Sequence, residues 1–402
     1  MKAIKNFFEK TRPHVQKGAK YHWLHSVHDG FFTLFFVQKN TSKSGVHIHD
    51  YTDLKRTMGI VVLALVPALL FGIYNTGYQH FKSIGEIAST GFFEMFLYGL
   101  LKVLPILIVS YVVGLGIEFA FAQVRGHDIN EGFLVSGFLI PMVLPVETPL
   151  WMVAVATAFA VVFGKEVFGG TGMNIFNPAL LARAFLFFAY PAYMTGDFVW
   201  ISDLANNAKV VDGFSGATPL SAMAAASTEP NIDAAREIIS GVPDLWTLFV
   251  GLLPGSIGET SKIAILIGAV ILLVTGIASW RIMLSALVGG VVMTLVFNAV
   301  GANVYMEVSP LQQIMMGSFL FGIVFMATDP VSGTQTNRGK LIYGFLIGLF
   351  IILIRVFNPA YPEGTMLAIL LMNSFAPLID YFVVEGHIKK RQKRIARINL
   401  QK

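Results

Sequence analysis

The chain has 402 residues, of which 55% are hydrophobic and 13% charged, and its mean hydropathy is +0.66. A soluble domain cannot cover a core of that composition with a polar surface, so much of the chain must face lipid. The lack of cysteine excludes disulfides and any iron–sulfur cluster ligated by this chain alone, and the net charge of +5 is concentrated at the chain ends, which does not indicate nucleic-acid binding.

Residues 1–57 differ from the rest of the chain. Their apolar side chains recur with helical spacing among lysines and histidines, which predicts an amphipathic cytoplasmic or interfacial segment: Ala3, Ile4, Phe7, Phe8, Trp23, Leu24, Val27, Phe31 and Phe32. The first long apolar run begins only near Thr57, so we expect no secretory signal peptide. His47 and His49 lack nearby thiols or paired carboxylates, so we expect solvated or headgroup-facing histidines and no metal site.

About ten apolar runs are long enough to cross or nearly cross a bilayer. They lie at 58–77, 97–122, 132–145, 150–164, 179–194, 263–279, 283–299, 311–327, 341–357 and 365–384. Proline and glycine interrupt several of them, and a broken helix at membrane depth must be covered by protein or line a cavity. The pattern predicts an all-α polytopic membrane protein with broken or re-entrant helices.

Short strings recur in the two halves of the chain. Phe176-Asn177-Pro178-Ala179 precedes the fifth run and Phe357-Asn358-Pro359-Ala360 the tenth, while Pro-Val pairs follow the third and eighth. Because each half has an odd number of spans, the second copy would be inverted. We therefore predict two inverted five-helix repeats, at 58–197 and 262–384, with ligands near their interface.

The positive charges predict the orientation. The basic N-terminus, the basic tail at 385–402 and the basic residues Arg125, Lys165 and Arg281 fall on one side, which would be cytoplasmic. Both termini are then cytoplasmic. The polar region 198–261 lies on the periplasmic side.

A glycine-rich loop separates the fourth and fifth runs, at 164–178. It lacks the Lys-Ser or Lys-Thr ending of a phosphate-binding P-loop and follows no strand. The amides of Asn174 and Asn177 can both donate and accept hydrogen bonds, which suits the polar edge of an isoalloxazine ring. The alternative is a turn in which the glycines and asparagines serve only packing.

The region 198–261 contains the most specific motif, Asp212-x-x-Ser215-Gly216-Ala217-Thr218. Glycines around Ser215 and the small Ala217 leave the backbone open, so that a modifying enzyme could reach the Thr218 hydroxyl. The string resembles the sequence read by the flavin transferase that links FMN through its phosphate to threonine. The alternative is an Asx turn with a serine cap.

Further strings in order along nearly the whole chain resemble the family of B subunits of sodium-translocating NADH:quinone oxidoreductases. The D subunit of the Rnf complex is related, but it generally lacks so long an N-terminal extension. The matching strings are Asp53-Leu54-Lys55-Arg56, Phe168-Gly169-Gly170-Thr171-Gly172, Pro254-Gly255-Ser256-Ile257-Gly258-Glu259, Met326-Ala327-Thr328-Asp329-Pro330-Val331 and Asn358-Pro359-Ala360-Tyr361-Pro362-Glu363-Gly364.

The resemblance implies a subunit of a respiratory enzyme in the bacterial inner membrane that passes electrons to quinone and couples this to sodium translocation. It implies covalent FMN on Thr218 and noncovalent riboflavin near Asn174 and Asn177. The implied partners are membrane lipid, a periplasmic flavin transferase and the other members of a six-subunit complex: the A subunit, an FMN-carrying C subunit, iron-binding D and E subunits and an NADH-oxidising F subunit.

The resemblance also implies a quinone region at Gly114, Leu115 and Glu118, where Leu115 replaces the second glycine of a pair. Glu118, Asp329 and Asp380 lie within or next to apolar runs. An acid at the centre of an isolated membrane helix costs about 2 to 3 kcal/mol or more. By resemblance these acids belong to sodium entry or coupling. The alternative for each is an acid at a helix end that reaches water.

Two other classes fit the predicted architecture. One is a channel or transporter without redox chemistry, and the other is a structural anchor for a redox complex. Neither explains the flavin-attachment motif on the outer face.

Overall fold

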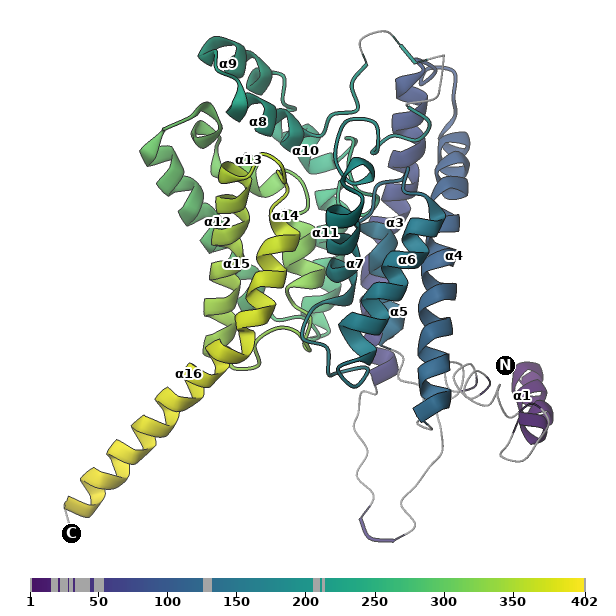
Figure 1. Cartoon of the computed structure of the whole chain (residues 1–402), viewed down its shortest axis with the longest axis vertical. Helices are drawn as coiled ribbons and strands as arrows, with labels where there is room; N and C mark the ends of the chain where they lie inside the picture. Colours follow the sequence, from purple (N-terminus) through teal and green to yellow (C-terminus); the bar gives the residue numbers. More distant parts are fainter. Residues whose placement is uncertain are drawn as a thin grey trace.

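The computed structural model describes residues 2–15, 21, 28, 32, 44–46, 54–125, 132–204, 210–211 and 214–400. This part of the chain is built of helices joined by turns and loops (Figure 1). The helices are α1 (Lys2–Val15), α3 (Leu54–Ser83), α4 (Phe92–Arg125), α5 (Phe133–Met142), α6 (Leu150–Val161), α7 (Pro178–Ala189), α8 (Pro219–Thr228), α9 (Ile232–Ser240), α10 (Leu245–Val250), α11 (Lys262–Val274), α12 (Trp280–Val300), α13 (Pro310–Met315), α14 (Phe319–Phe321), α15 (Asn337–Phe357) and α16 (Thr365–Leu400).

Each predicted apolar run coincides with helix, but the helices are of two kinds. Within the described residues, α3, α4, α12, α15 and α16 are long and apolar enough to cross a membrane by themselves. The others are short or interrupted: α6 continues into the π-helical turn Val162–Glu166, and the run 311–327 divides into α13, α14 and the π-helical turn Gly322–Met326. The prediction of an all-α polytopic membrane protein with broken helices is confirmed.

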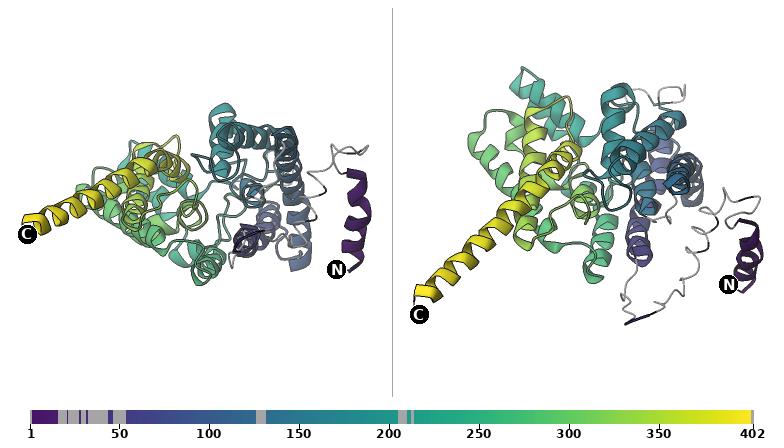
Figure 2. Two further views of the ribbon diagram at one scale, coloured as in Figure 1. Left: turned by 90° about the horizontal axis from the view of Figure 1, so that it is seen from below. Right: turned by 60° about the horizontal axis from the view of Figure 1, so that its bottom comes forward.

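The two halves of the chain run in opposite directions and share several of their helix contacts. In Figure 1, α3, α5 and α7 ascend where α11, the α13–α14 segment and α16 descend, and the second and fourth helices of each half are opposed in the same way. The second helix packs on the fourth, and the fourth on the fifth, in both halves. Across the interface α3 packs on α11 and α7 on α16. This is the arrangement of an inverted repeat, and Figure 2 shows the halves side by side.

The two ends of the helical bundle differ in the elements that they carry. The short helices α8, α9 and α10 lie at one of them, which we name the Thr218 end (Figure 1). The start of α3 and the protruding last turns of α16 lie at the opposite end, the C-terminal end. Thr218 and the basic tail are therefore on opposite ends of the bundle, as the charge distribution predicts. The assignment of these ends to periplasm and cytoplasm stays a prediction.

The N-terminal segment is described only in part. Residues Lys2–Val15 form α1, as their apolar spacing predicts. Thr11 and the ring of His28 are joined by a hydrogen bond of 3.0 Å, and the same ring lies edge-on to Phe8. His47 and His49, like Trp23, Leu24, Val27 and Phe31, lie outside the described residues.

Candidate cofactor sites at the two ends of the bundle

Thr218 is the N-cap of α8. Its hydroxyl oxygen accepts a hydrogen bond from the backbone N–H of Ser221 at 3.1 Å, and Pro219, which has no N–H, fills the first helical position. Ser215 accepts from the N–H of Ala217 at 3.2 Å and so forms a serine turn beside the threonine; the Asx turn considered as an alternative depends on Asp212. Asp212 lies outside the described residues.

Gly216 serves a purpose other than the one expected. It is buried, and a side-chain carbon at this position would lie 2.1 Å from the carbonyl oxygen of Asp197. The glycine therefore allows two segments of backbone to pack against each other and does not hold the chain open. Access to the Thr218 hydroxyl comes instead from the partial exposure of Thr218 itself, next to the exposed Ser215.

A pocket begins at Thr218 and extends to the start of α11. It encloses about 430 Å³ of empty space, part of it open to solvent, and has apolar walls with a polar, charged floor. The walls include Leu220, Leu248, Leu253 and Met315, and the floor includes Glu259, Lys262 and Glu363. Pockets of this size with a few placed polar groups are typical of cofactor sites.

Buried ion pairs behind this floor join the two halves. Arg183 on α7 contacts Glu259, just before α11, at 3.2 Å and also pairs with Glu363, just before α16. Arg355 is fully buried and donates to the carbonyl oxygens of Gln313, Met316 and Glu363. The pair between Arg183 and Glu363 therefore joins the two halves at the Thr218 end, while Arg355 connects segments within the second half.

The residues around Thr218 fit a flavin phosphoester. The hydroxyl stands at the N-terminus of a ten-residue helix, where backbone N–H groups and the helix dipole favour a phosphate. The ester oxygen could still accept the N–H of Ser221, because esterification removes the proton and leaves a lone pair.

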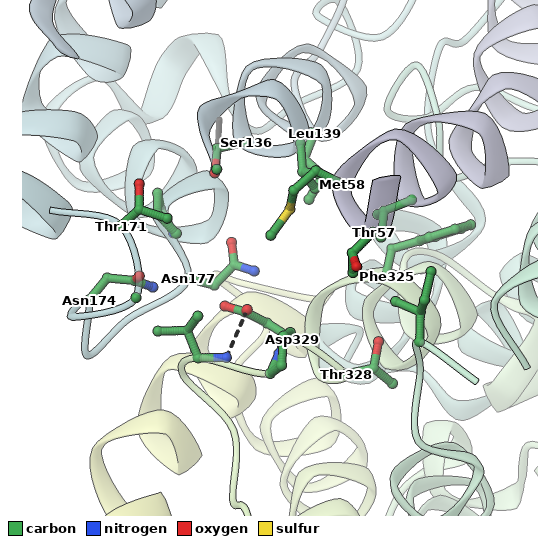
Figure 3. A pocket seen from close by; sticks show the side chains of 18 of the residues that line it. Thr57, Met58, Ser136, Leu139, Thr171, Asn174, Asn177, Phe325, Thr328 and Asp329 are labelled. Carbon is green, nitrogen blue, oxygen red and sulfur yellow. Dashed lines mark hydrogen bonds between the residues drawn. The ribbon is translucent and has the colours of Figure 1, made fainter. Parts of the chain in front are cut away.

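A second pocket lies between the halves at the C-terminal end (Figure 3). It encloses about 800 Å³ of empty space, part of it open to solvent, between the starts of α3, α5 and α7, the end of α11 and the turn after Phe325. Asn174, Asn177 and Asp329 all line it. The structure thus brings together a predicted riboflavin pair and a predicted sodium-coupling acid, which the sequence places in separate halves.

Both asparagines also form hydrogen bonds that hold the local backbone. The Asn177 side-chain oxygen accepts from the N–H groups of Ala179 and Leu180, at 3.0 and 3.3 Å, and so caps α7. Asn174 donates to the carbonyl of Phe176 at 3.0 Å. The rest of each amide faces the pocket in Figure 3. Amide groups above a broad, largely apolar space fit the polar edge of a flat ring, so the residues present suit a flavin here too.

Two of the three predicted sodium-coupling acids hold the turn between Ala327 and α15. Asp329 accepts from the N–H of Val331 at 3.1 Å and from the Ser332 hydroxyl at 2.7 Å. Asp380, on α16, accepts from the N–H groups of Gln335 and Thr336, at 2.6 and 3.0 Å. Both carboxylates therefore find their donors within the protein.

Glu118 is buried on α4 in an ion pair with Lys165, which is itself only 3% exposed and lines the pocket at the C-terminal end. Next to them, Arg125 contacts Glu166 at 2.9 Å. Lys165 served as a surface charge in the orientation argument, and the structure shows instead a buried partner of Glu118.

The predicted quinone residues share one face of α4 only in part. Gly114 and Glu118, one turn apart, are buried, and a side-chain carbon at Gly114 would lie 1.8 Å from the ring of Phe133. Leu115 is partly buried and packs against the core. Close packing with α5 thus requires glycine at position 114. The contacts of Leu115 are those of a core side chain.

The buried basic residues Arg183, Lys262 and Arg355 were not among the predicted site residues. They carry a sequence signal all the same, since charged side chains inside or at the edge of apolar runs are costly and mark paired or functional positions.

Fold and site together define a polytopic membrane protein with inverted helical halves, one pocket between the halves at the C-terminal end and a second pocket beside Thr218 at the other end. The chain belongs to the NQR2, RnfD, RnfE family, whose model matches residues 41–389. It is 44% identical to the B subunit of the Na(+)-translocating NADH-quinone reductase of Chromohalobacter salexigens, over 98% of this chain and 97% of that protein. The corresponding B subunits of Ectopseudomonas mendocina and Yersinia pestis are 43% and 42% identical, over 97% of this chain and 99% of each protein.

Proposed function

We propose that this protein is the membrane-embedded B subunit of a sodium-translocating NADH:quinone reductase complex. The identity with the B-subunit relatives extends over almost the whole of both chains, which favours this function over that of the Rnf members of the same family. Channel and anchor functions leave the Thr218 pocket unexplained. The partners would be quinone, membrane lipid and the other subunits of the complex, in a bacterial inner membrane.

The observation that carries the redox part of the proposal is the position of Thr218, at a helix N-terminus and at the mouth of a pocket. Thr218 would supply the oxygen of an FMN phosphoester made by a periplasmic flavin transferase, with Ser215 and Gly216 shaping the turn that this enzyme reads. Asn174 and Asn177 would orient riboflavin at the opposite end. Flavins, when bound, supply electron transfer, and the two pockets would place one at each end of the subunit.

Sodium coupling would involve the acids of the C-terminal end. Asp329 lines the pocket proposed for riboflavin, and Lys165, the partner of Glu118, lines it too. Asp380 acts on the same turn as Asp329, through Gln335 and Thr336. A change at that pocket would therefore alter the surroundings of all three carboxylates. Carboxylates are hard oxygen ligands and suit a sodium ion. The quinone would bind along α4 near Gly114, Leu115 and Glu118.

Thr218→Ala tests the covalent attachment. We expect the denatured subunit to lose its flavin fluorescence in gel electrophoresis, while the chain still inserts and assembles. Thr334→Val is the matched control, because Thr334 also follows a Ser-Gly pair but is only 2% exposed and lies in the turn before α15. A fluorescent Thr218→Ala subunit would refute the attachment site.

A further inference from the structure

A buried cluster of charged residues at and behind the Thr218 pocket contains more cations than carboxylates. Three basic residues, Arg183, Lys262 and Arg355, are each no more than 5% exposed, and all are joined by hydrogen bonds to the segments around Glu259 and Glu363. The two carboxylates are both engaged by Arg183. Three cations against two anions leave one positive charge unbalanced within this cluster.

Lys262 is the cation that faces the pocket. Its ammonium group donates to the backbone carbonyls of Glu259 and Gly317, both at 2.9 Å, and within the described residues it forms no ion pair. An ammonium group has three N–H donors, so one is left for a ligand. Lys262 also lines the pocket together with Thr218.

Arg355 is a poorer candidate, because its guanidinium group is already occupied. All three of its nitrogens donate to carbonyl oxygens, and the group stacks over the ring of Phe319. Arg355 therefore ties together the segments that precede α14 and α16. The unbalanced charge that a ligand could reach is that of Lys262.

An unpaired buried charge is costly, and proteins normally provide it with a counter-ion. Lys165, the other buried lysine in the part of the chain that the structure describes, follows that rule, since it is paired with Glu118. Lys262 has no carboxylate partner among the described residues, which indicates an anionic group from outside the chain. That group would have to reach the pocket beside Thr218.

We propose that Lys262 is a positioning residue for the flavin attached at Thr218, and that its ammonium group neutralises the negative charge of the reduced isoalloxazine ring. The inference rests on the proposed function. Reduction by one electron, or by two electrons and one proton, from a redox group of a partner subunit leaves one negative charge on the ring. The phosphate is a second anion, but the N-terminus of α8 already provides for it beside Thr218.

Lys262 then sets the midpoint potential of this flavin, because a cation beside the ring stabilises the reduced form more than the neutral oxidised form. In Lys262→Met, we expect the equilibrium between reduced and oxidised flavin to shift by at least about tenfold toward the oxidised form. That factor corresponds to about 30 mV for a two-electron couple and about 59 mV for a one-electron couple. Lys262→Arg keeps the charge and should keep most of the potential.

The experiment is a redox titration of the purified complex, followed by flavin absorbance, for the wild type, Lys262→Met and Lys262→Arg. The other flavins of the complex serve as internal references, since only one component should move. Fluorescence of the denatured subunit reports separately whether flavin is attached. Arg236→Met is the control, because it removes an exposed cation whose pair with Glu307 lies outside the pocket, and it should leave this component in place.

The outcomes are distinct. A lower potential in Lys262→Met that Lys262→Arg restores supports the proposal. An unchanged potential with flavin attached overturns it, as does an inserted Lys262→Met chain without flavin, which would assign the lysine to the phosphate or to the attachment reaction. A subunit whose fluorescence survives Thr218→Ala contradicts the proposed attachment instead, so the two failures cannot be confused.

Heat stability provides a measurement that does not depend on turnover. In a Thr218→Ala background the pocket lacks its anion, so Lys262→Met should leave the Tm of the complex unchanged or raise it by removing a buried unpaired charge. In the flavin-carrying complex reduced with dithionite, the same substitution should lower the Tm. The same change of Tm in both backgrounds would contradict a role of Lys262 toward the flavin.

Discussion

The two ends of the bundle are related by the inverted repeat, yet they handle buried charge in opposite ways. At the C-terminal end each buried or half-buried acid has its donor within the chain: Lys165 for Glu118, and backbone N–H groups for Asp329 and Asp380. In the buried cluster at the Thr218 end, Arg183, Lys262 and Arg355 outnumber the carboxylates of Glu259 and Glu363, and Lys262 donates only to carbonyl oxygens. The two halves thus share a helix arrangement but differ in how their buried charges are balanced.

The largest expected effect comes from breaking the network that joins the halves at the Thr218 end. Arg183→Met removes the ion-pair partner of the buried Glu259 and the half-buried Glu363, and we expect a loss of about 3 to 5 kcal/mol in the free energy of unfolding. Arg236→Met is the control, because its pair with Glu307 is exposed, at 3.7 Å, and such pairs contribute about 0 to 1 kcal/mol. Thermal unfolding of the purified protein compares them. Equal, small losses would show that the network does not hold the halves together.

The buried pair at the C-terminal end sharpens the contrast between the two lysines. Lys165→Met alone should destabilise the protein by a few kcal/mol, about 3 to 5, since Glu118 is left unpaired in the interior. Combining it with Glu118→Gln should recover much of that loss. A double-mutant cycle on Tm measures the coupling. If the double variant is no more stable than Lys165→Met, then Glu118 has another partner, and the two ends differ less in how their buried charges are balanced.

The next prediction separates the cap of α7 from cofactor binding. Asn177→Asp keeps a side-chain oxygen for the N–H groups of Ala179 and Leu180 but loses the amide donor that faces the pocket. Combined Asn174→Leu and Asn177→Leu should deplete acid-extractable riboflavin and slow quinone reduction, with the Thr218-linked flavin retained. Asn177→Asp should lose riboflavin without the roughly 1 kcal/mol cost of a lost cap. Unchanged riboflavin in both variants would make the asparagines structural only.

Substitutions of Asp380 test whether an acid whose carboxylate accepts backbone hydrogen bonds also takes part in sodium transport. Asp380→Asn keeps acceptors for the N–H groups of Gln335 and Thr336 but removes the charge, whereas Asp380→Ala removes both. If the charge helps admit sodium, both variants should need several-fold more sodium for half-maximal quinone reductase activity. A purely structural acid predicts a different pattern, in which only Asp380→Ala loses heat stability and neither variant changes the sodium requirement.

The smallest effect is expected at Asp203, in the loop after α7 at the Thr218 end. Burial alone would raise the pKa of this carboxyl, but hydrogen bonds from Lys102, at 2.8 Å, and Tyr98, at 2.7 Å, outweigh it and lower the pKa. The stabilisation is present above the ordinary aspartate pKa of about 3.9 and disappears as the pH falls through the lower folded value.

Asp203→Asn should therefore make the Tm less dependent on pH in the acid range, with little change at neutral pH, because the side chain is 43% exposed. Asparagine also tolerates the left-handed backbone of this residue, whose φ is +59°. Melting curves from about pH 6 to 3 test this. A wild-type and variant profile of equal slope would show that Asp203 does not contribute.

Some features of the fold and site were predictable because they depend on local pattern. Long apolar runs gave α3, α4, α12, α15 and α16, and proline and glycine marked the broken helices between them. The string Asn-Pro-Ala correctly marked the start of α7, where the asparagine caps and the proline fills the first turn. The boundaries of the five proposed regions, the roles of the acids and the cofactor assignments stay predictions.

Other features depend on which distant residues meet, and no local pattern encodes that. Glu118 and Lys165 are 47 positions apart, and Arg183 and Glu363 are 180 apart. Gly216 illustrates the same limit. Glycine is required there because the carbonyl of Asp197 occupies the space of a side chain. The sequence by itself determined the class of protein, its helices and the position of the Ser-Gly-Ala-Thr string before α8, because hydrophobicity, caps and motifs act over a few positions. Only the tertiary structure decided which buried charges are balanced and which one is left facing the pocket below Thr218, because a charge is balanced by what lies within a few ångströms in space.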